Sequence, residues 1–109
     1  MSGRIRYMRL IVFFDLPVRT PGQRKNYAVF RRFLEKNGYL MMQESVYSKL
    51  ALNDRIAAGL VAKLREHRPP EGLVQVLKVT EKQYATIDSI VGSARRGFEL
   101  EDIETLVVL

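Results

Sequence analysis

The sequence has 109 residues, no cysteine and a single histidine, His67, which excludes a disulfide framework, a thiolate metal site and a multi-histidine ligand set within one chain. Its net charge of +6 is uneven, because residues 1–36 carry nine basic residues against two acids and the remaining 73 residues carry a net charge of −1. This asymmetry favours a surface that binds a polyanion, most often nucleic acid, over a merely solvated basic face.

The length and the hydropathy pattern predict one domain that is soluble and cytoplasmic. A chain of this length can bury a modest hydrophobic core without disulfides or a structural metal. It contains no run of eighteen apolar residues, and residues 1–6 lack the apolar core of a signal peptide. We therefore expect no membrane association.

The first predicted element is a central strand around the five consecutive apolar residues Leu10–Phe14, which we expect to be buried on both faces. Asp15 ends this run, and Pro17 cannot donate to a sheet ladder. A carboxylate at the end of a buried strand is costly unless it is paired, bound to metal or open to water. Asp15 is thus the first candidate site residue; the alternative is that it caps the loop 16–19 or pairs with an arginine.

A helix is predicted from about residue 21 to 36. Thr20-Pro21-Gly22-Gln23 has the form of a capping box with proline at the first helical position, and Asn37-Gly38 supplies the stop. Helical spacing puts one apolar group on one side and four basic residues on the other. The apolar group is Tyr27, Phe30, Phe33 and Leu34, and the basic residues are Arg24, Lys25, Arg31 and Arg32.

Residues 39–50 favour two strands, or one bent strand, broken near Gln43–Ser45. Asn53 is a plausible cap for a second helix, which Pro69-Pro70 would terminate. His67 falls at the C-terminal end of that helix. It is therefore predicted to interact with the helix dipole or with solvent, and not to act as a ligand.

The remaining elements are a strand over Leu73–Val79, a helical turn opened by the capping box Thr80–Gln83, and a short strand over Ile87–Val91 that Gly92 ends. A loop over residues 93–97 and an acidic segment over Glu99–Glu104 follow. The last apolar run, Thr105–Leu109, is expected to add to a sheet edge in the same chain or in a second copy.

The order of strand, helix, strand, strand, helix and strand predicts a ferredoxin-like α+β sandwich, with an antiparallel sheet, both helices on one face and an extra C-terminal strand. We divide the chain into a core, residues 1–92, and a C-terminal tail, residues 93–109. The unbroken run Leu10–Phe14 indicates that something covers the open face of the sheet. The simplest cover is a second copy packed sheet to sheet about a two-fold axis.

The sequence offers little other catalytic chemistry, since nucleophile motifs and glycine-rich phosphate loops are both absent. One carboxylate is a poor metal site. Two copies of Asp15 across a two-fold axis would be a better one for Mg²⁺, which takes oxygen ligands and keeps its waters. Such a pair could activate water against a phosphodiester.

Three segments form an ordered set: Arg6–Pro17, Gly38–Leu50 and Val79–Tyr84. As a set they resemble the small adaptation protein of CRISPR systems, the Cas2 family, and most closely the branch that accompanies single-effector, Cas9-type systems. The resemblance implies a ferredoxin-like homodimer in which residues 105–109 complete the partner's sheet. It also implies a dimer that bridges two dimers of the Cas1 integrase and holds the captured double-stranded DNA for spacer acquisition.

Members of this family are also described as metal-dependent nucleases, and the resemblance carries over residue by residue. Asp15 matches the acidic residue at the end of the first strand, with Mg²⁺ shared across the dimer. Arg19 matches the basic loop position after that strand, and Arg24 falls where many relatives have basic residues. Met41 stands where several nuclease-type relatives have a basic residue, which counts against a complete nuclease site.

These observations leave three hypotheses. The first is a non-catalytic, dimeric DNA-binding adaptor; the alternative is a metal-dependent endonuclease of DNA or RNA that uses Asp15; the third is a ferredoxin-like regulatory module. The residues expected to contact nucleic acid are Arg19, Arg24, Lys25, Arg31 and Arg32. The residues expected to contact a basic protein partner are Glu99, Glu101, Asp102 and Glu104.

Overall fold

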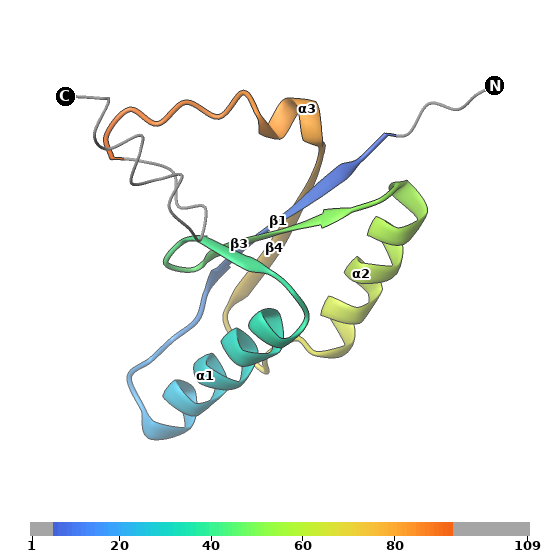
Figure 1. Ribbon diagram of the computed structural model, residues 1–109. Coiled ribbons are helices and arrows are strands. Elements are labelled where there is room, and N and C mark those ends of the chain that lie inside the picture. Colours follow the sequence, from blue (N-terminus) through green and yellow to red (C-terminus); the bar gives the residue numbers. More distant parts are fainter. Residues whose placement is uncertain (1–5, 93–109) are drawn as a thin grey trace.

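The computed structural model describes residues 6–92 and shows a four-stranded sheet covered by helices on one side (Figure 1). The elements, in chain order, are β1 (Met8–Asp15), α1 (Pro21–Lys36), β2 (Leu40–Gln43), β3 (Val46–Ala51), α2 (Asp54–Glu66), β4 (Leu73–Thr80) and the single turn α3 (Glu81–Tyr84). The strand order is β2-β3-β1-β4, and every neighbouring pair is antiparallel. The predicted ferredoxin-like α+β fold is confirmed.

The core lies between the sheet and both helices. Because side chains alternate along a strand, Leu10, Val12 and Phe14 of β1 point to the same side, where α1 contributes Phe30 and Leu34 and α2 contributes Ala57 and Leu64. The Phe14 ring meets the Phe30 ring edge-on, with centroids 5.2 Å apart. Burying each such side chain contributes roughly 1.5–3 kcal/mol, so this layer holds α1 and α2 on one face of the sheet.

The predicted helix caps are present. Thr20 Oγ1 accepts a hydrogen bond from the Gln23 amide at 3.0 Å, and Gln23 Oε1 accepts one from the Thr20 amide at 3.0 Å, which completes the capping box of α1. Asn53 Oδ1 accepts from the Ile56 amide at 2.8 Å and caps α2. His67 lies at the C-cap of α2, where its ring stacks on Phe33 of α1 with centroids 4.3 Å apart. The histidine therefore links the two helices.

The segment 39–50 divides as expected, since β2 and β3 are joined by a tight turn at Glu44 and Ser45, with Ser45 at a φ of 68°. The expected strand over Ile87–Val91 is wrong. Those residues are irregular, and Ile90 and Val91 are 89% and 92% exposed. A strand needs a neighbour that satisfies its backbone groups, and this segment pairs with no strand of residues 6–92.

The opposite side of the sheet carries no helix within residues 6–92, and we call it the open face. Strand register puts large apolar side chains from four strands there, and Phe13, in the middle of β1, is 38% exposed. Burial of Leu10–Phe14 on both faces is thus incomplete in the described chain. The exposed apolar residues of the open face are Phe13, Leu40, Leu50, Leu73 and Leu77.

Several expectations lie outside the described residues. These are the loop over 93–97, the acidic segment Glu99–Glu104, the strand Thr105–Leu109 and with them the division of the chain at residue 92. Between residues 6 and 92, neither long helix has the length and apolar character needed to cross a membrane.

Candidate nucleic-acid interface

Asp15 is the last residue of β1, and its exposed side chain points to the open face beside Phe13 and the paired Leu73. The start of β4 closes on this position. A Cβ atom at Gly72 would lie 2.8 Å from the carbonyl oxygen of Asp15, and Gly72 has a φ of 97°. We call the junction of Asp15, Leu16 and Gly72 the Asp15 corner.

The Asp15 carboxylate forms no hydrogen bond or ion pair with any other described residue. Among residues 6–92, the Asp15 carboxylate therefore neither caps the loop 16–19 nor pairs with an arginine. No group of three acidic, histidine or cysteine side chains suited to a metal ion occurs among residues 6–92. Residues 6–92 of one chain therefore provide no complete set of acidic ligands for Mg²⁺ at the Asp15 corner.

The loop after Asp15 is held by the first turn of α1. Gln23 Oε1 accepts hydrogen bonds from the backbone amides of Arg19 and Thr20 at 2.9 and 3.0 Å. Arg24 Nη1 donates to the carbonyl oxygens of Val18 and Arg19 at 3.2 and 3.0 Å. The side chain of Arg19 itself is exposed and forms no hydrogen bond with another residue of 6–92.

The structure places all five predicted nucleic-acid contacts on α1 or the loop before it, and all five are exposed. They differ in their partners. Arg24 is turned back onto the loop, and Arg31 Nε lies 3.9 Å from Glu35 Oε2 in a loose, solvated pair. Lys25 and Arg32 point outward with no partner among the described residues. The acidic candidates Glu99, Glu101, Asp102 and Glu104 lie outside residues 6–92.

A cluster that the sequence analysis missed neutralises one of the N-terminal basic residues. Arg9 Nε and Nη2 donate to the Glu81 carboxylate at 2.8 and 2.6 Å, and the guanidinium lies 4.3 Å from the centre of the Tyr84 ring. These groups meet because Arg9 pairs with Val79 just before α3 begins. Only that strand register could have indicated a contact between residues 72 positions apart.

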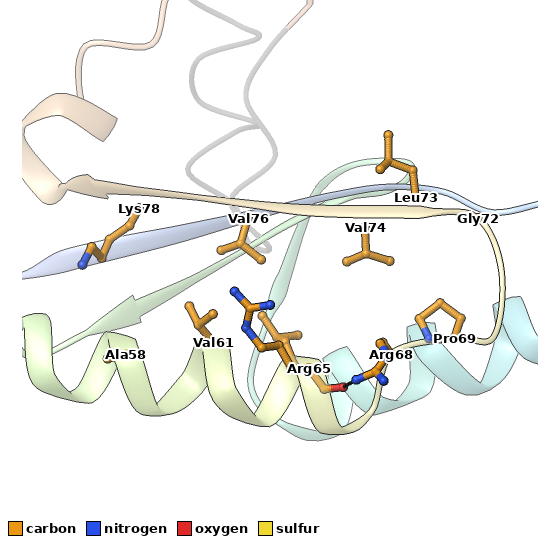
Figure 2. Close-up of a pocket in the computed structure, with 11 residues that line it drawn as sticks. Ala58, Val61, Arg65, Arg68, Pro69, Gly72, Leu73, Val74, Val76 and Lys78 are labelled. Carbon is orange, nitrogen blue, oxygen red and sulfur yellow. Dashed lines mark hydrogen bonds between the residues drawn. The ribbon is translucent and has the colours of Figure 1, made fainter.

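A groove of about 620 Å³ runs between α2 and β4 (Figure 2). Its floor is apolar and its rim is basic, with Arg65, Arg68 and Lys78 at the opening. Two of these cations are engaged, since Arg68 Nη1 donates to the Arg65 carbonyl at 2.8 Å and Lys78 Nζ lies 2.5 Å from Asp54 Oδ1. The apolar floor consists of Val61, Leu64, Val74 and Val76.

Comparison with known proteins gives a consistent result. The family described as CRISPR-associated protein Cas2 matches residues 8–87. Three curated relatives share the name CRISPR-associated endoribonuclease Cas2. The one from Treponema denticola is 54% identical over 102 residues, 94% of this chain and 100% of the relative. Those from Streptococcus mutans and Lacticaseibacillus rhamnosus are 47% and 39% identical, over 72% and 93% of this chain and 72% and 100% of each relative.

Proposed function

The chain belongs to the CRISPR-associated Cas2 family, and from this premise we propose that it is a dimeric adaptor that binds double-stranded DNA during spacer acquisition. The observation that carries the proposal is that the chain has a basic surface on one side of the sheet and an apolar surface on the other. All five predicted nucleic-acid contacts are exposed on α1 and the loop before it, whereas five large apolar side chains are exposed together on the open face of the sheet.

The open face supports the dimer. Single exposed apolar residues scattered over a surface are normal, but five large ones on one face of a sheet form a patch. Such a patch is typical of an interaction site. A second copy packed about a two-fold axis buries the same patch on both chains. In this proposal the dimer bridges Cas1 integrase dimers, with Glu99, Glu101, Asp102 and Glu104 as the contacts for that basic partner.

The basic surface supports the DNA contact. Arginine and lysine on one helix and its leading loop suit phosphates, which carry no sequence information, so binding would be insensitive to sequence and sensitive to salt. Arg19, Lys25 and Arg32 are the residues whose side chains are available, while Arg24 and Arg31 add positive charge beside them.

The experiment that tests the adaptor measures duplex-DNA binding across a salt series. We expect affinity that is independent of Mg²⁺, falls steeply with salt, survives Asp15→Asn and weakens in the double variant Arg31→Glu, Arg32→Glu. The control is Arg55→Glu, Lys63→Glu, which makes the same charge change on exposed positions of α2. Equal losses in the two double variants, or no salt-dependent affinity at all, would contradict the proposal and favour a regulatory module.

A second candidate, a metal-dependent endoribonuclease, is favoured by the name that the relatives carry and by the Asp15 carboxylate on the open face, which has no partner among residues 6–92. Two chains packed through that face would each contribute one Asp15 to a shared Mg²⁺. When bound, the metal would supply a water activated for attack on a phosphodiester. Asp15 would hold the ion, and Arg19, four residues on, would hold a neighbouring phosphate.

This candidate is tested with single-stranded RNA and duplex DNA, in Mg²⁺ or in chelator, using the intact protein and Asp15→Asn. Loss of substrate that requires Mg²⁺ and disappears in Asp15→Asn, with the dimer retained in sedimentation, would establish the nuclease. Cleavage that persists in Asp15→Asn would trace the activity to a contaminant or to another site.

A further inference from the structure

We propose that Gln23 and Arg24 are positioning residues, which fix the backbone of Arg19 so that its side chain meets a nucleic-acid phosphate. Arg24 then acts through Arg19 instead of by a phosphate contact of its own. The inference rests on the proposed nucleic-acid-binding function. It gives different roles to two arginines of equal charge that lie five residues apart.

The hydrogen bonds around Arg19 carry the argument. The backbone amide of Arg19 donates to Gln23 Oε1 at 2.9 Å, and its carbonyl oxygen accepts from Arg24 Nη1 at 3.0 Å. Both polar groups of this backbone position are therefore taken up by side chains of the first turn of α1. Arg24 Nη1 also reaches the carbonyl of Val18 at 3.2 Å, so one nitrogen spans two successive peptides.

The neighbouring sequence restricts the same loop. Pro17 and Pro21 fix their own φ angles, and Thr20, which precedes Pro21, has the extended conformation that a residue before proline requires, with φ −102° and ψ 160°. Gln23 Nε2 lies 3.5 Å from Glu71 Oε2, next to the Asp15 corner. The loop is thus built before any ligand arrives, which lowers the entropy lost when Arg19 binds.

The side chains of Arg19 and Arg24 differ in how many hydrogen-bond donors remain available to a ligand. The Arg19 guanidinium is exposed and has no partner among residues 6–92, whereas the Arg24 guanidinium is directed at the loop carbonyls. Gln23 carries no charge and its Oε1 accepts from the loop amides, so its removal takes no positive charge from the surface and acts on phosphate binding chiefly through the loop. This makes Gln23→Ala the decisive variant.

The test is a set of double-variant cycles in duplex-DNA binding, with Arg19→Gln as the common partner and a mixed-sequence duplex as the probe. Arg19→Gln should lower the slope of log affinity against log salt by about 0.9 for each chain that contacts the duplex. Gln23→Ala should weaken binding by a similar factor in the intact background, but by less than about two-fold, the usual error of additivity, once Arg19 is already replaced.

Arg24→Gln and Lys25→Gln form a matched pair, since each removes one positive charge from the first turns of α1. We expect Arg24→Gln to lose most of its effect in the Arg19→Gln background and Lys25→Gln to keep its full effect there. A full, independent loss for Arg24→Gln, or no effect of Gln23→Ala in the intact background, would overturn the proposal.

Amide hydrogen exchange separates failure of this inference from failure of the proposed function. If the unmodified protein does not bind duplex DNA, the proposed function fails, and the loop can still be examined. Gln23→Ala should then speed exchange of the Arg19 and Thr20 amides and leave the amides of β1 unchanged. Unchanged exchange at Arg19 would overturn the positioning role; Arg24→Gln serves as the second variant if Gln23→Ala lowers folding stability too far.

Discussion

Gly72 is the residue on which the Asp15 corner depends most directly. Its φ of 97° is a conformation that a side chain disfavours, and an added Cβ would lie within 2.8 Å of the Asp15 carbonyl oxygen. We expect Gly72→Ala to lower the free energy of unfolding by about 2 kcal/mol or more, because the strain and the backbone clash add. Urea denaturation measures this loss.

Gly59 provides the control, since it lies in the exposed interior of α2 and a Cβ there would have no neighbour within 4 Å. Gly59→Ala should raise the free energy of unfolding by about 0.5–1 kcal/mol through helix propensity. Equal effects of the two substitutions would show that the Asp15 corner is not tightly packed.

Tyr39 makes stability depend on alkaline pH. Burial raises the pKa of its hydroxyl to about 12, whereas in the unfolded chain it ionises near pH 10. As the pH rises from 10, the unfolded chain loses this proton first, so the free energy of unfolding falls until about pH 12. Urea midpoints over this range should fall less in Tyr39→Phe than in the unmodified protein; parallel curves would contradict the assignment.

Among the elements, those with local chemical signals were predicted well. The capping boxes at Thr20 and Thr80 and the cap at Asn53 fix where α1, α3 and α2 begin, and each depends on residues within one turn. The break between β2 and β3 has a similar origin, because polar residues interrupt the apolar pattern there. These hydrogen bonds join residues that are close together in the sequence, so a single sequence is enough to predict them.

The elements predicted poorly depend on residues far apart in the chain. Ile87–Val91 has strand composition but no neighbouring strand within residues 6–92, and composition alone cannot supply a pairing partner. The contacts of Arg9 with Glu81 and Tyr84 likewise follow from the register of β1 on β4. A charge total that counted Arg9 as free therefore overstated the available basic surface.

The Arg9–Glu81 pair attaches α3 to the sheet, and we expect Glu81→Gln to loosen that helix. The pair is bidentate, part-buried and stacked on Tyr84, so it should contribute more than an exposed ion pair. Hydrogen exchange at the amides of Ala85 and Thr86, which donate to α3 carbonyls, should speed up in this variant.

The comparison for that prediction is Asp54→Asn, which breaks the more exposed pair between Asp54 and Lys78. Exposed pairs contribute only about 0–1 kcal/mol, so exchange near α3 should not change and stability should fall little. If Glu81→Gln behaves like Asp54→Asn, the Arg9 cluster does not hold α3 in place.

At the scale of the whole molecule, the open face predicts association. Leu77, at the centre of β4 and 49% exposed, should tolerate Leu77→Lys in the single chain but not in a sheet-to-sheet dimer. Sedimentation should give a dimer for the unmodified protein and a monomer of unchanged helical content for Leu77→Lys. Val29→Lys, at a 52% exposed position of α1, is the control and should remain dimeric.

The sequence was enough to predict which residues belong to the candidate site, but not which contacts they make. The sequence identifies Asp15, Arg19 and the basic residues of α1 by their place after a buried strand and on one side of a helix. It does not show that Arg24 bends back to the loop or that Gly72 packs on the Asp15 backbone, because those contacts need the finished geometry of β1, α1 and β4. Neighbouring side chains of the same charge therefore have different contacts in the folded chain.

The one-sided placement of α1 and α2 also bears on stoichiometry. Two chains joined through their open faces would carry their helices on opposite outer sides, and with roughly 10 Å between successive layers the two α1 helices would lie on the order of 30 Å apart. One straight duplex cannot lie along both outer sides, but it can follow the rim, where the loop containing Arg19 joins sheet to helix. Titration endpoints would distinguish these modes: one duplex per dimer indicates the rim, and two indicate separate outer surfaces.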